Sequence, residues 1–209
     1  RDLRMSRGLG DVYKRQGCTL TAFQKCESIT DIVVVCRSQD EEEIRKTADS
    51  LGITKLHGFA QGGSTRQQTV INGLRKISPD TEMIAVHDGA RPLVNPAHIE
   101  KTIKDASVFG GAVLGVPVKD TIKIVHDGLI EDTPHRPSLY ITQTPQVFKR
   151  RLYFEGVDFA LEHELDFTDD CQLMEAIGVK VCMTTGDYKN IKITTPEDIK
   201  IAQLLLQED

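Results

Sequence analysis

Short apolar runs alternate with longer amphipathic segments along this chain, and that alternation limits its fold more than any other feature. Ile32–Cys36 is a continuous apolar run rich in β-branched residues, which is typical of a strand covered on both faces. We expect it to be a central parallel strand. Residues 41–51 have an acidic first turn and apolar side chains at helical spacing, and Gly52 follows them, so they predict a helix.

The same rhythm continues through the middle of the chain. Further strands are expected at residues 55–59, 83–86 and 111–118. Further helices are expected near 70–74, after a glycine-rich loop, and from Asn95 and Pro96 to about residue 107. Consecutive strand–helix units predict an α/β protein with a Rossmann-like, mostly parallel sheet and helices on both faces. Ligands of such sheets bind at the carboxyl ends of the strands.

Residues 122–133 interrupt this rhythm. Two short apolar segments flank Asp127 and Gly128, and an Asp-Gly pair between apolar strands is a strong signal for a β-hairpin. We expect an inserted β-hairpin arm over about residues 119–140. An exposed hairpin is often stabilised by pairing with a second subunit, so a homodimer through the arm is expected.

The rest of the chain predicts one domain over residues 17–209. Helices are expected at 149–163 and 169–177, a strand at 179–183, and a final helix that starts at Thr195 and Pro196. Residues 1–16 differ, because they are rich in arginine and have neither a strand nor a helix period. We interpret them as an atypical leader.

Composition excludes several classes of protein. The net charge of −5 disfavours a non-specific nucleic-acid binder. No run approaches the roughly 20 apolar residues that span a bilayer, and no secretory leader opens the chain. The five cysteines form no Cys-x-x-Cys pair, which argues against a zinc site or a disulfide framework. We therefore expect a cytoplasmic protein that binds neither nucleic acid nor membrane.

Polar residues directly follow the expected strand at 83–86. Asp88 supplies the hard oxygen that Mg²⁺ prefers, and Arg91 offers a fork for a phosphate. The alternative is an Asp88–Arg91 pair that only braces a turn. His87 points opposite to Asp88 on an extended chain, so we expect it to be structural.

The loop at 62–66, Gly-Gly-Ser-Thr-Arg, follows a strand and opens a helix. Its amides and the positive helix end can therefore meet an anion or a base edge. An alternative, equally open from the sequence, is a turn in which Ser64 caps the helix and Gln67 closes a capping box.

Two further residues are candidates for binding oxygen atoms. Thr121 follows the strand at 111–118 and is placed to donate to a substrate, although a solvated loop has the same sequence. Lys192 lies between two isoleucines, so it either snorkels from an edge strand or points inward. The sequence contains no nucleophile elbow and no Walker motif. A cationic, hydroxyl-rich sheet edge suits direct displacement at phosphorus, which requires mainly positioning and charge neutralisation.

Five motifs stand in the order and spacing of one family: residues 62–70, 87–92, 116–121, 143–148 and 190–198. From about Thr19 to its end, the chain resembles the 2-C-methyl-D-erythritol 4-phosphate cytidylyltransferase family of non-mevalonate isoprenoid synthesis. The resemblance implies a Rossmann-like fold with a dimerising β-arm. It also implies that CTP and the small-molecule substrate 2-C-methyl-D-erythritol 4-phosphate react with Mg²⁺ present and release pyrophosphate.

The resemblance also implies roles for particular residues. The implied nucleotide-binding residues are Gly62, Gly63, Ser64, Arg66, Thr69, Asp88 and Gly89, with Thr69 in place of the family's usual serine. The implied substrate-binding residues are Asp88, Arg91, Thr121, Arg136, Thr144 and Lys192. Asp88 is the implied metal ligand. Arg136 and Lys192 are the implied catalytic residues that position the attacking phosphate, which favours an inward Lys192.

One departure from the family concerns the start of the chain. The family begins with a strand and an Ala-Ala-Gly-x-Gly-x-Arg-Met loop, then Pro-Lys-Gln, which together grip the triphosphate. Residues 1–16 do not match it. We therefore expect exposed sheet edges and catalysis slower by roughly 10²-fold or more for each lost donor. A ribitol-5-phosphate cytidylyltransferase of the same family and a catalytically impaired, binding or dimerising homologue remain alternatives.

Overall fold

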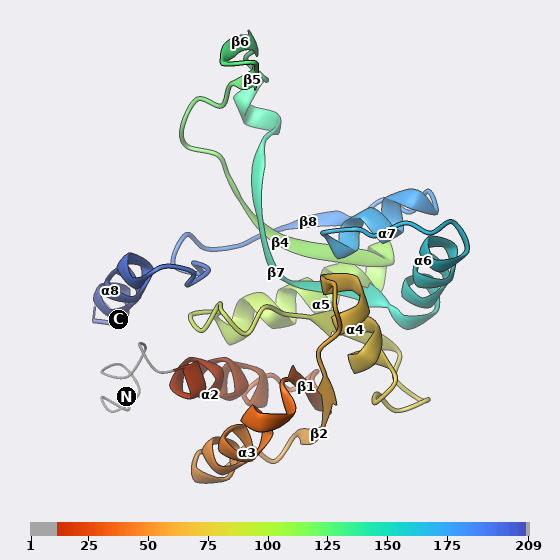
Figure 1. Cartoon of the computed structure of the whole chain (residues 1–209), viewed down its shortest axis with the longest axis vertical. Coiled ribbons are helices and arrows are strands. Elements are labelled where there is room, and N and C mark those ends of the chain that lie inside the picture. The colour runs from red at the N-terminus through yellow and green to blue at the C-terminus, as the bar shows by residue number, and fades with distance from the viewer. Residues whose placement is uncertain (1–11, 208–209) are drawn as a thin grey trace.

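The computed structural model describes residues 12–207, and Figure 1 shows the path of the chain. The helices are α2 (Val12–Gln24), α3 (Glu41–Ser50), α4 (Arg66–Leu74), α5 (Pro96–Phe109), α6 (Arg150–Glu162), α7 (Asp170–Ala176) and α8 (Pro196–Leu205). The strands are β1 (Ile32–Cys36), β2 (Leu56–Gln61), β3 (Met83–Val86), β4 (Gly111–Pro117), β5 (Ile124–His126), β6 (Leu129–Asp132), β7 (Tyr140–Lys149) and β8 (Cys182–Thr185). Two 3₁₀ turns lie at Ser38–Asp40 and Arg136–Ser138. This order confirms the predicted α/β class.

The strands form separate sheets. Strands β1 and β2 pair in parallel, and a four-stranded sheet has the order β3-β7-β4-β8. In the latter, β4 is parallel to β8, whereas β7 is antiparallel to both β3 and β4. Antiparallel β7 enters the sheet as the return of the arm, which gives the sheet its mixed character.

The prediction that Ile32–Cys36 is a central strand is wrong for the part of the chain that the structure describes. Strand β1 is one of only two strands in its sheet, and all five of its residues are half-buried. The physical reason is that no described strand joins β1 to β3, so one edge of each strand has no partner strand. This observation matches the expectation of exposed sheet edges.

Side chains of the four-stranded sheet alternate between two core layers. Ala112 and Val147 face α5, where they pack with Ala106. Their neighbours Val113 and Phe148 face the opposite way and pack with α4, α6 and α7. This two-residue period places a helical layer on each face and fixes β4 and β7 as the centre of the fold.

Helix starts follow the expected capping chemistry, with one exception. Asn95 accepts a hydrogen bond from the Ala97 amide, and Thr195 forms a capping box with Asp198. At α4 the cap is Thr65, which accepts from the Gln68 amide. The alternative that placed the cap at Ser64 is therefore wrong by one position, because the adjacent hydroxyl takes that role.

The hairpin arm is present as expected. Strands β5 and β6 pair antiparallel, and Asp127 and Gly128 take positive φ values of 49° and 80° between them. These are the left-handed conformations that a two-residue hairpin turn requires. Figure 1 shows the arm projecting away from the rest of the chain.

Two boundaries differ from expectation. The strand expected at 179–183 is observed at Cys182–Thr185, in register with β4. Helix α2 begins at Val12, so residues 12–16 of the expected leader are helical. Residues 1–11 of that leader lie outside the described residues.

Candidate active site

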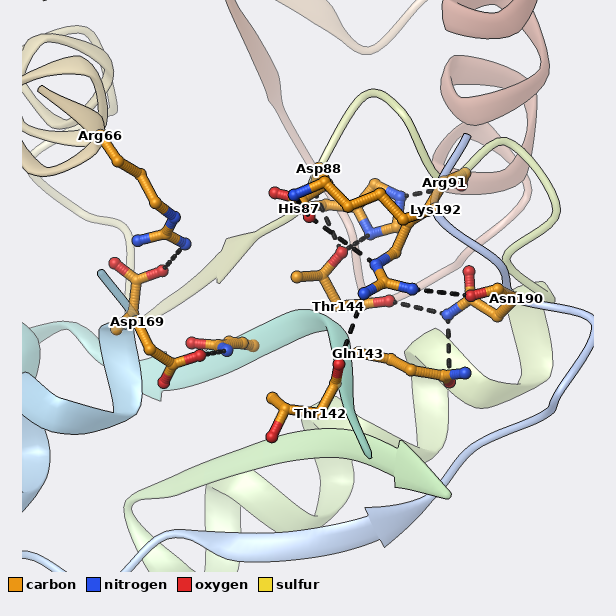
Figure 2. Close-up of polar contacts among 12 residues, drawn as sticks. Arg66, His87, Asp88, Arg91, Thr142, Gln143, Thr144, Asp169, Asn190 and Lys192 are labelled. Atoms are coloured by element: carbon orange, nitrogen blue, oxygen red, sulfur yellow. Dashed lines mark hydrogen bonds and ion pairs between the residues drawn. The ribbon is translucent and has the colours of Figure 1, made fainter. Parts of the chain in front are cut away.

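The loop that follows β3 is held by a threonine of the neighbouring strand β7. The Asp88 amide donates to Thr144 Oγ1 at 3.1 Å, and that hydroxyl lies 3.0 Å from His87 Nδ1. His87 Nε2 lies 3.1 Å from the Arg91 carbonyl oxygen, which only accepts. Nε2 therefore carries the proton, and the Thr144 hydroxyl donates to Nδ1. Figure 2 shows this chain of contacts.

His87 is structural, as its position predicts. Burial lowers the pKa of its imidazole from 6.5 to about 4, so the ring is neutral near pH 7. A neutral ring is what the relay from Thr144 to Arg91 requires, because one nitrogen must accept and the other must donate. His87 thereby fixes the turn that presents Asp88.

Asp88 is the anionic centre of the site. Lys192 Nζ lies 3.0 Å from Asp88 Oδ2, and Arg91 Nε lies 3.7 Å from the same oxygen. Partial burial raises the pKa of Asp88, but the hydrogen bond and charge of Lys192 and the charge of Arg91 outweigh it. The net pKa is lowered, so the carboxylate is ionised at neutral pH.

Backbone carbonyls orient Arg91. One terminal nitrogen donates to the Asn190 carbonyl at 2.8 Å, and the other donates to the Thr142 carbonyl at 3.3 Å. Its Nε is buried and has no hydrogen-bond partner among the described residues. A buried donor without a hydrogen-bond partner is costly, and the charge of Asp88 at 3.7 Å offsets part of that cost.

Two buried amides brace this cluster, and neither was predicted from the sequence to have a role. Asn190 is 1% exposed and donates to the Thr144 carbonyl at 3.0 Å. Gln143 donates to the Asp187 carbonyl at 2.8 Å. Both residues lie inside the motifs at 143–148 and 190–198, so their place in these motifs was the available signal.

The glycine-rich loop is folded by its own helix. The Gly63 amide donates to Thr69 Oγ1 at 3.0 Å, and this hydroxyl donates to the Thr65 carbonyl at 2.8 Å. A Cβ at Gly63 would lie 2.4 Å from Gln68 Cγ, so only glycine fits there. The hydroxyl of Thr69 thus sets the shape of the loop.

Arg66, at the start of α4, is anchored to α7. Its guanidinium forms an ion pair with Asp170, whose other oxygen accepts from the Tyr153 hydroxyl at 2.6 Å. The Asp170 side chain is 3% exposed, whereas that of Arg66 is 34% exposed. Nearby, Gln67 bonds to both Leu165 and Phe167 of the segment before α7. The loop at 62–66 is therefore tied to the α6–α7 connection.

Residues at the start of α4 and residues of the loop after β3 line one cavity of about 440 Å³. Arg66 and Thr69 line it from α4, and Asp88 and Gly89 line it from the loop after β3. Arg91, Thr144 and Lys192 contact Asp88 or its amide. The structure thus brings together most of the residues that the sequence singled out.

Two residues are not brought to this cluster within one chain. Thr121 is exposed in the segment that leaves β4, and Arg136 lies in the arm, where it donates to the Lys119 carbonyl at 3.2 Å. Within one chain both residues belong to the arm and its approach rather than to the loop that carries Asp88. The reason is that β4 ends at Pro117 and the chain then enters the arm.

The residues of this site could hold a magnesium ion only together with phosphate oxygens and water. In residues 12–207, no group of three or more His, Cys, Asp or Glu side chains could hold a metal by itself. Mg²⁺ is commonly held by one or two carboxylates, with phosphate oxygens and water as the other ligands. The ionised Asp88 can supply the one carboxylate.

Within residues 12–207, no helix combines the length and apolar character needed to cross a membrane.

Comparison with known proteins gives one consistent result. The family model described as IspD, 2-C-methyl-D-erythritol 4-phosphate cytidylyltransferase, matches residues 16–208. A cytidylyltransferase of this name from Caldanaerobacter subterraneus subsp. tengcongensis is 41% identical, covering 100% of this chain and 95% of that protein. One from Desulforamulus reducens is 44% identical, with coverages of 90% and 82%.

Solved structures agree with this result. The 4-diphosphocytidyl-2C-methyl-D-erythritol synthase of Anaerococcus prevotii superposes with a TM-score of 0.85 at 32% identity, covering 92% of this chain and 86% of that one. The 2-C-methyl-D-erythritol 4-phosphate cytidylyltransferase of Thermus thermophilus gives 0.75 at 29% identity, with coverages of 91% and 87%. The chain belongs to the 2-C-methyl-D-erythritol 4-phosphate cytidylyltransferase family.

Proposed function

We propose that this protein transfers the cytidylyl group of CTP to 2-C-methyl-D-erythritol 4-phosphate and releases pyrophosphate. The family assignment supports this reaction. The structural observation that carries it is the ionised Asp88 held between Lys192 and Arg91 at the carboxyl end of β3. The relatives named above carry the name of this activity.

The reaction is a direct displacement at phosphorus. A phosphate oxygen of the acceptor forms a bond to the α-phosphorus of CTP, and the bond from that phosphorus to the bridging oxygen breaks. The electron pair of the broken bond leaves on pyrophosphate. Positioning and charge neutralisation supply most of the catalysis in such a transfer. The Lys192 ammonium would hold the attacking phosphate, while Arg91 would keep the Asp88 carboxylate in place through its ion pair.

The nucleotide would be held at the opposite wall of the cavity. The Ser64 amide stands at the start of α4, where a backbone donor and the helix dipole favour an acceptor. The Gly62 and Gly63 amides already donate to the Cys36 carbonyl and the Thr69 hydroxyl, so these two glycines would shape the wall instead. Arg66 adds a positive charge to that wall and is held in place by Asp170. Thr69 would act indirectly, because its hydroxyl accepts from the Gly63 amide and so holds the loop in shape.

Asp88 would also hold Mg²⁺, together with phosphate oxygens of the nucleotide. When bound, the ion would neutralise charge on the phosphates. Asp88 already contacts Lys192, so the carboxylate serves both partners and keeps the lysine near the site. Its lowered pKa keeps it available as an anion throughout the neutral range.

We include a homodimer in the proposal. The arm has exposed apolar side chains, among them Ile124, Leu129 and Ile130, which would be covered by a second copy. Arg136 and Thr121 lie on this arm, and neither contacts the Asp88 cluster of its own chain. An arm that reaches a second copy would therefore bring both residues to the partner's site.

The cysteines support a cytoplasmic location. All five are free thiols, and burial is the largest cause that raises the pKa of Cys18 and Cys26 to about 11. Such thiols are rarely ionised at neutral pH, and because the thiolate is the reactive form, they form disulfides slowly. Unpaired cysteines are usual in a reducing compartment.

The test is a product assay with alternative acceptors. The chain is incubated with CTP and Mg²⁺ and with either 2-C-methyl-D-erythritol 4-phosphate or ribitol 5-phosphate, and products are followed by phosphorus NMR. Pyrophosphate release with the first acceptor is expected. Release with ribitol 5-phosphate alone would overturn the substrate assignment. Binding of CTP without release of pyrophosphate in the presence of either acceptor would overturn the transferase proposal.

A further inference from the structure

One segment links the arm to the candidate active site. Residues 186–193, which we call the connecting segment, lie between β8 and α8 and carry Lys192. Figure 1 shows this stretch passing the base of the arm. We call that base, residues 117–119 with 139–140, the arm root. The connecting segment contacts both the arm root and the loop that carries Asp88.

Tyr188 makes the contact with the arm root. Its hydroxyl donates to the Pro117 carbonyl at 2.6 Å, and the Lys119 ammonium nitrogen lies 3.6 Å from the centre of its ring. A cation over the face of an aromatic ring is attracted to it. Tyr188 is 41% exposed, so its role lies in these two contacts rather than in core packing. It therefore binds the chain at two points where the chain leaves β4.

The direction of the arm is set at its root. The Val118 amide donates to the Leu139 carbonyl at 3.0 Å, and the Arg136 side chain donates to the Lys119 carbonyl at 3.2 Å. These bonds join the two legs of the arm to each other. Beyond the root, every residue of β5 and β6 is exposed. The contacts of Tyr188 with one leg therefore hold the whole arm.

The other end of the connecting segment is fixed to the active-site loop. The Asn190 carbonyl accepts from the Arg91 guanidinium at 2.8 Å, and the Ile193 amide donates to the Ala90 carbonyl at 2.8 Å. Lys192 lies between these two contacts along the chain. Figure 2 shows how Asn190, Arg91 and Lys192 converge on this loop. The backbone that carries the Lys192 ammonium is thus held on both sides.

The backbone around Tyr188 is also tightly held. The Asp187 carbonyl accepts from the Gln143 side chain at 2.8 Å and from the Asn190 amide at 3.0 Å. A Cβ at Gly186 would lie 2.5 Å from Gln143 Oε1, so the backbone packs directly against that side chain. A change at Tyr188 is therefore transmitted along the segment instead of being absorbed by a loose loop.

We propose that Tyr188 is a positioning residue for cytidylyl transfer, which sets the arm relative to Lys192 of the same chain. This role rests on the proposed function and its homodimer, in which each arm brings Thr121 and Arg136 to the partner's site. Tyr188 would then link the lysine of one site to the arm that completes the other. These groups serve the acceptor phosphate, whereas CTP is held by the wall at the start of α4. Loss of the Tyr188 contacts should weaken acceptor binding and leave CTP binding unchanged.

Steady-state kinetics of Tyr188 variants tests this role. Tyr188→Leu removes both contacts and should raise the KM for 2-C-methyl-D-erythritol 4-phosphate about tenfold, with the KM for CTP changed less than about twofold. Tyr188→Phe keeps the ring beside Lys119 and should restore the acceptor KM to within about threefold of the unsubstituted chain. The control Phe109→Leu, at an exposed ring of α5, should change neither KM. A merely structural loss would lower kcat and leave both KM values unchanged.

A double-mutant cycle separates positioning from a direct contact of Lys119 with substrate. Lys119→Met should raise the acceptor KM about threefold in the unsubstituted chain and have no effect in Tyr188→Leu. An equal rise in both backgrounds would show that Lys119 contacts the acceptor itself, and would overturn the link through Tyr188. If Tyr188→Leu does not fold, the cycle of Lys119→Met with Tyr188→Phe decides in the same way.

The outcomes distinguish this role from the proposed function. Transfer by the unsubstituted chain together with an unchanged acceptor KM in Tyr188→Leu would overturn the role of Tyr188 alone. Equal rises in the KM for CTP and for the acceptor would also overturn it, because the effect would not be confined to the acceptor. No pyrophosphate release by the unsubstituted chain would overturn the proposed function, and the role of Tyr188 with it.

Discussion

The Lys192 ammonium nitrogen lies 3.0 Å from Oδ2 of Asp88, and this contact joins the loop after β3 to the segment before α8. Figure 2 shows the lysine reaching across to the carboxylate. The Lys192 side chain is 49% exposed and that of Asp88 is 25% exposed, so neither charge is fully desolvated. Such a pair can exchange one partner for a phosphate or a metal ion at modest cost.

The Arg66–Asp170 ion pair is expected to stabilise both the fold and the nucleotide-binding wall. Asp170→Asn keeps the shape of the side chain but leaves Arg66 without its counter-charge. We expect the free energy of unfolding, measured by urea titration, to fall by about 2–3 kcal/mol. That is less than for a fully buried pair, because Arg66 is one-third exposed.

The control for this prediction is Asp166→Asn, at an exposed position in the same connection. It should change stability by less than about 0.5 kcal/mol. A double-mutant cycle with Arg66→Gln should give a coupling above about 1 kcal/mol. Additive effects of the two substitutions would contradict a direct interaction between these side chains.

His87 is expected to make the protein sensitive to mild acid. Its pKa is about 4 in the folded chain, against an ordinary value of 6.5, so the unfolded chain binds more protons between these pH values. Its contribution to stability is therefore present above pH 6.5 and is lost as the pH falls toward 4. Between pH 7 and pH 5, the loss from this group is about 2 kcal/mol.

His87→Gln removes this titration and is the comparison for urea unfolding at both pH values. The variant should lose about 2 kcal/mol less than the unsubstituted chain over that interval. The lowered pKa of Asp88 acts below its ordinary value of 3.8, outside this window. An identical pH dependence of the two proteins would show that His87 is not buried in its neutral form.

The arm is expected to carry the dimer contact. Ile130 is 65% exposed on β6, so Ile130→Ser removes apolar surface without disturbing the core. We expect sedimentation velocity to show at least a tenfold weaker dimer. Leu204→Ser, at a 62% exposed position on α8, should leave the dimer unchanged. Equal association of both variants would place the interface elsewhere.

Sequence reasoning succeeded where one local rule decides the outcome. The Asp-Gly pair at 127–128 predicted the hairpin turn, and the Thr195 start predicted the cap of α8. The cluster of Asp88 with Arg91 was also predictable, since a strand end delivers both to one edge. These features depend on neighbours close in sequence or on the direction of the strands.

Features that depend on distant partners were not predictable. The roles of Asn190 and Gln143 come from contacts 46 and 44 residues away along the chain. The place of Thr121 is not fixed by strand direction, because β4 ends at Pro117 and the chain then enters the arm. The choice of Thr65 over Ser64 as the α4 cap depends on a shift of one residue, which spacing alone does not resolve.

The central claim is that Lys192 positions the attacking phosphate, and one comparison tests it most directly. Single-turnover transfer from Mg²⁺-CTP to 2-C-methyl-D-erythritol 4-phosphate is measured for the unsubstituted chain, for Lys192→Met and for Lys200→Met, an exposed lysine of α8. The account predicts a rate at least about 10²-fold lower for Lys192→Met and an unchanged rate for Lys200→Met. Transfer by Lys192→Met at the rate of the unsubstituted chain would contradict it.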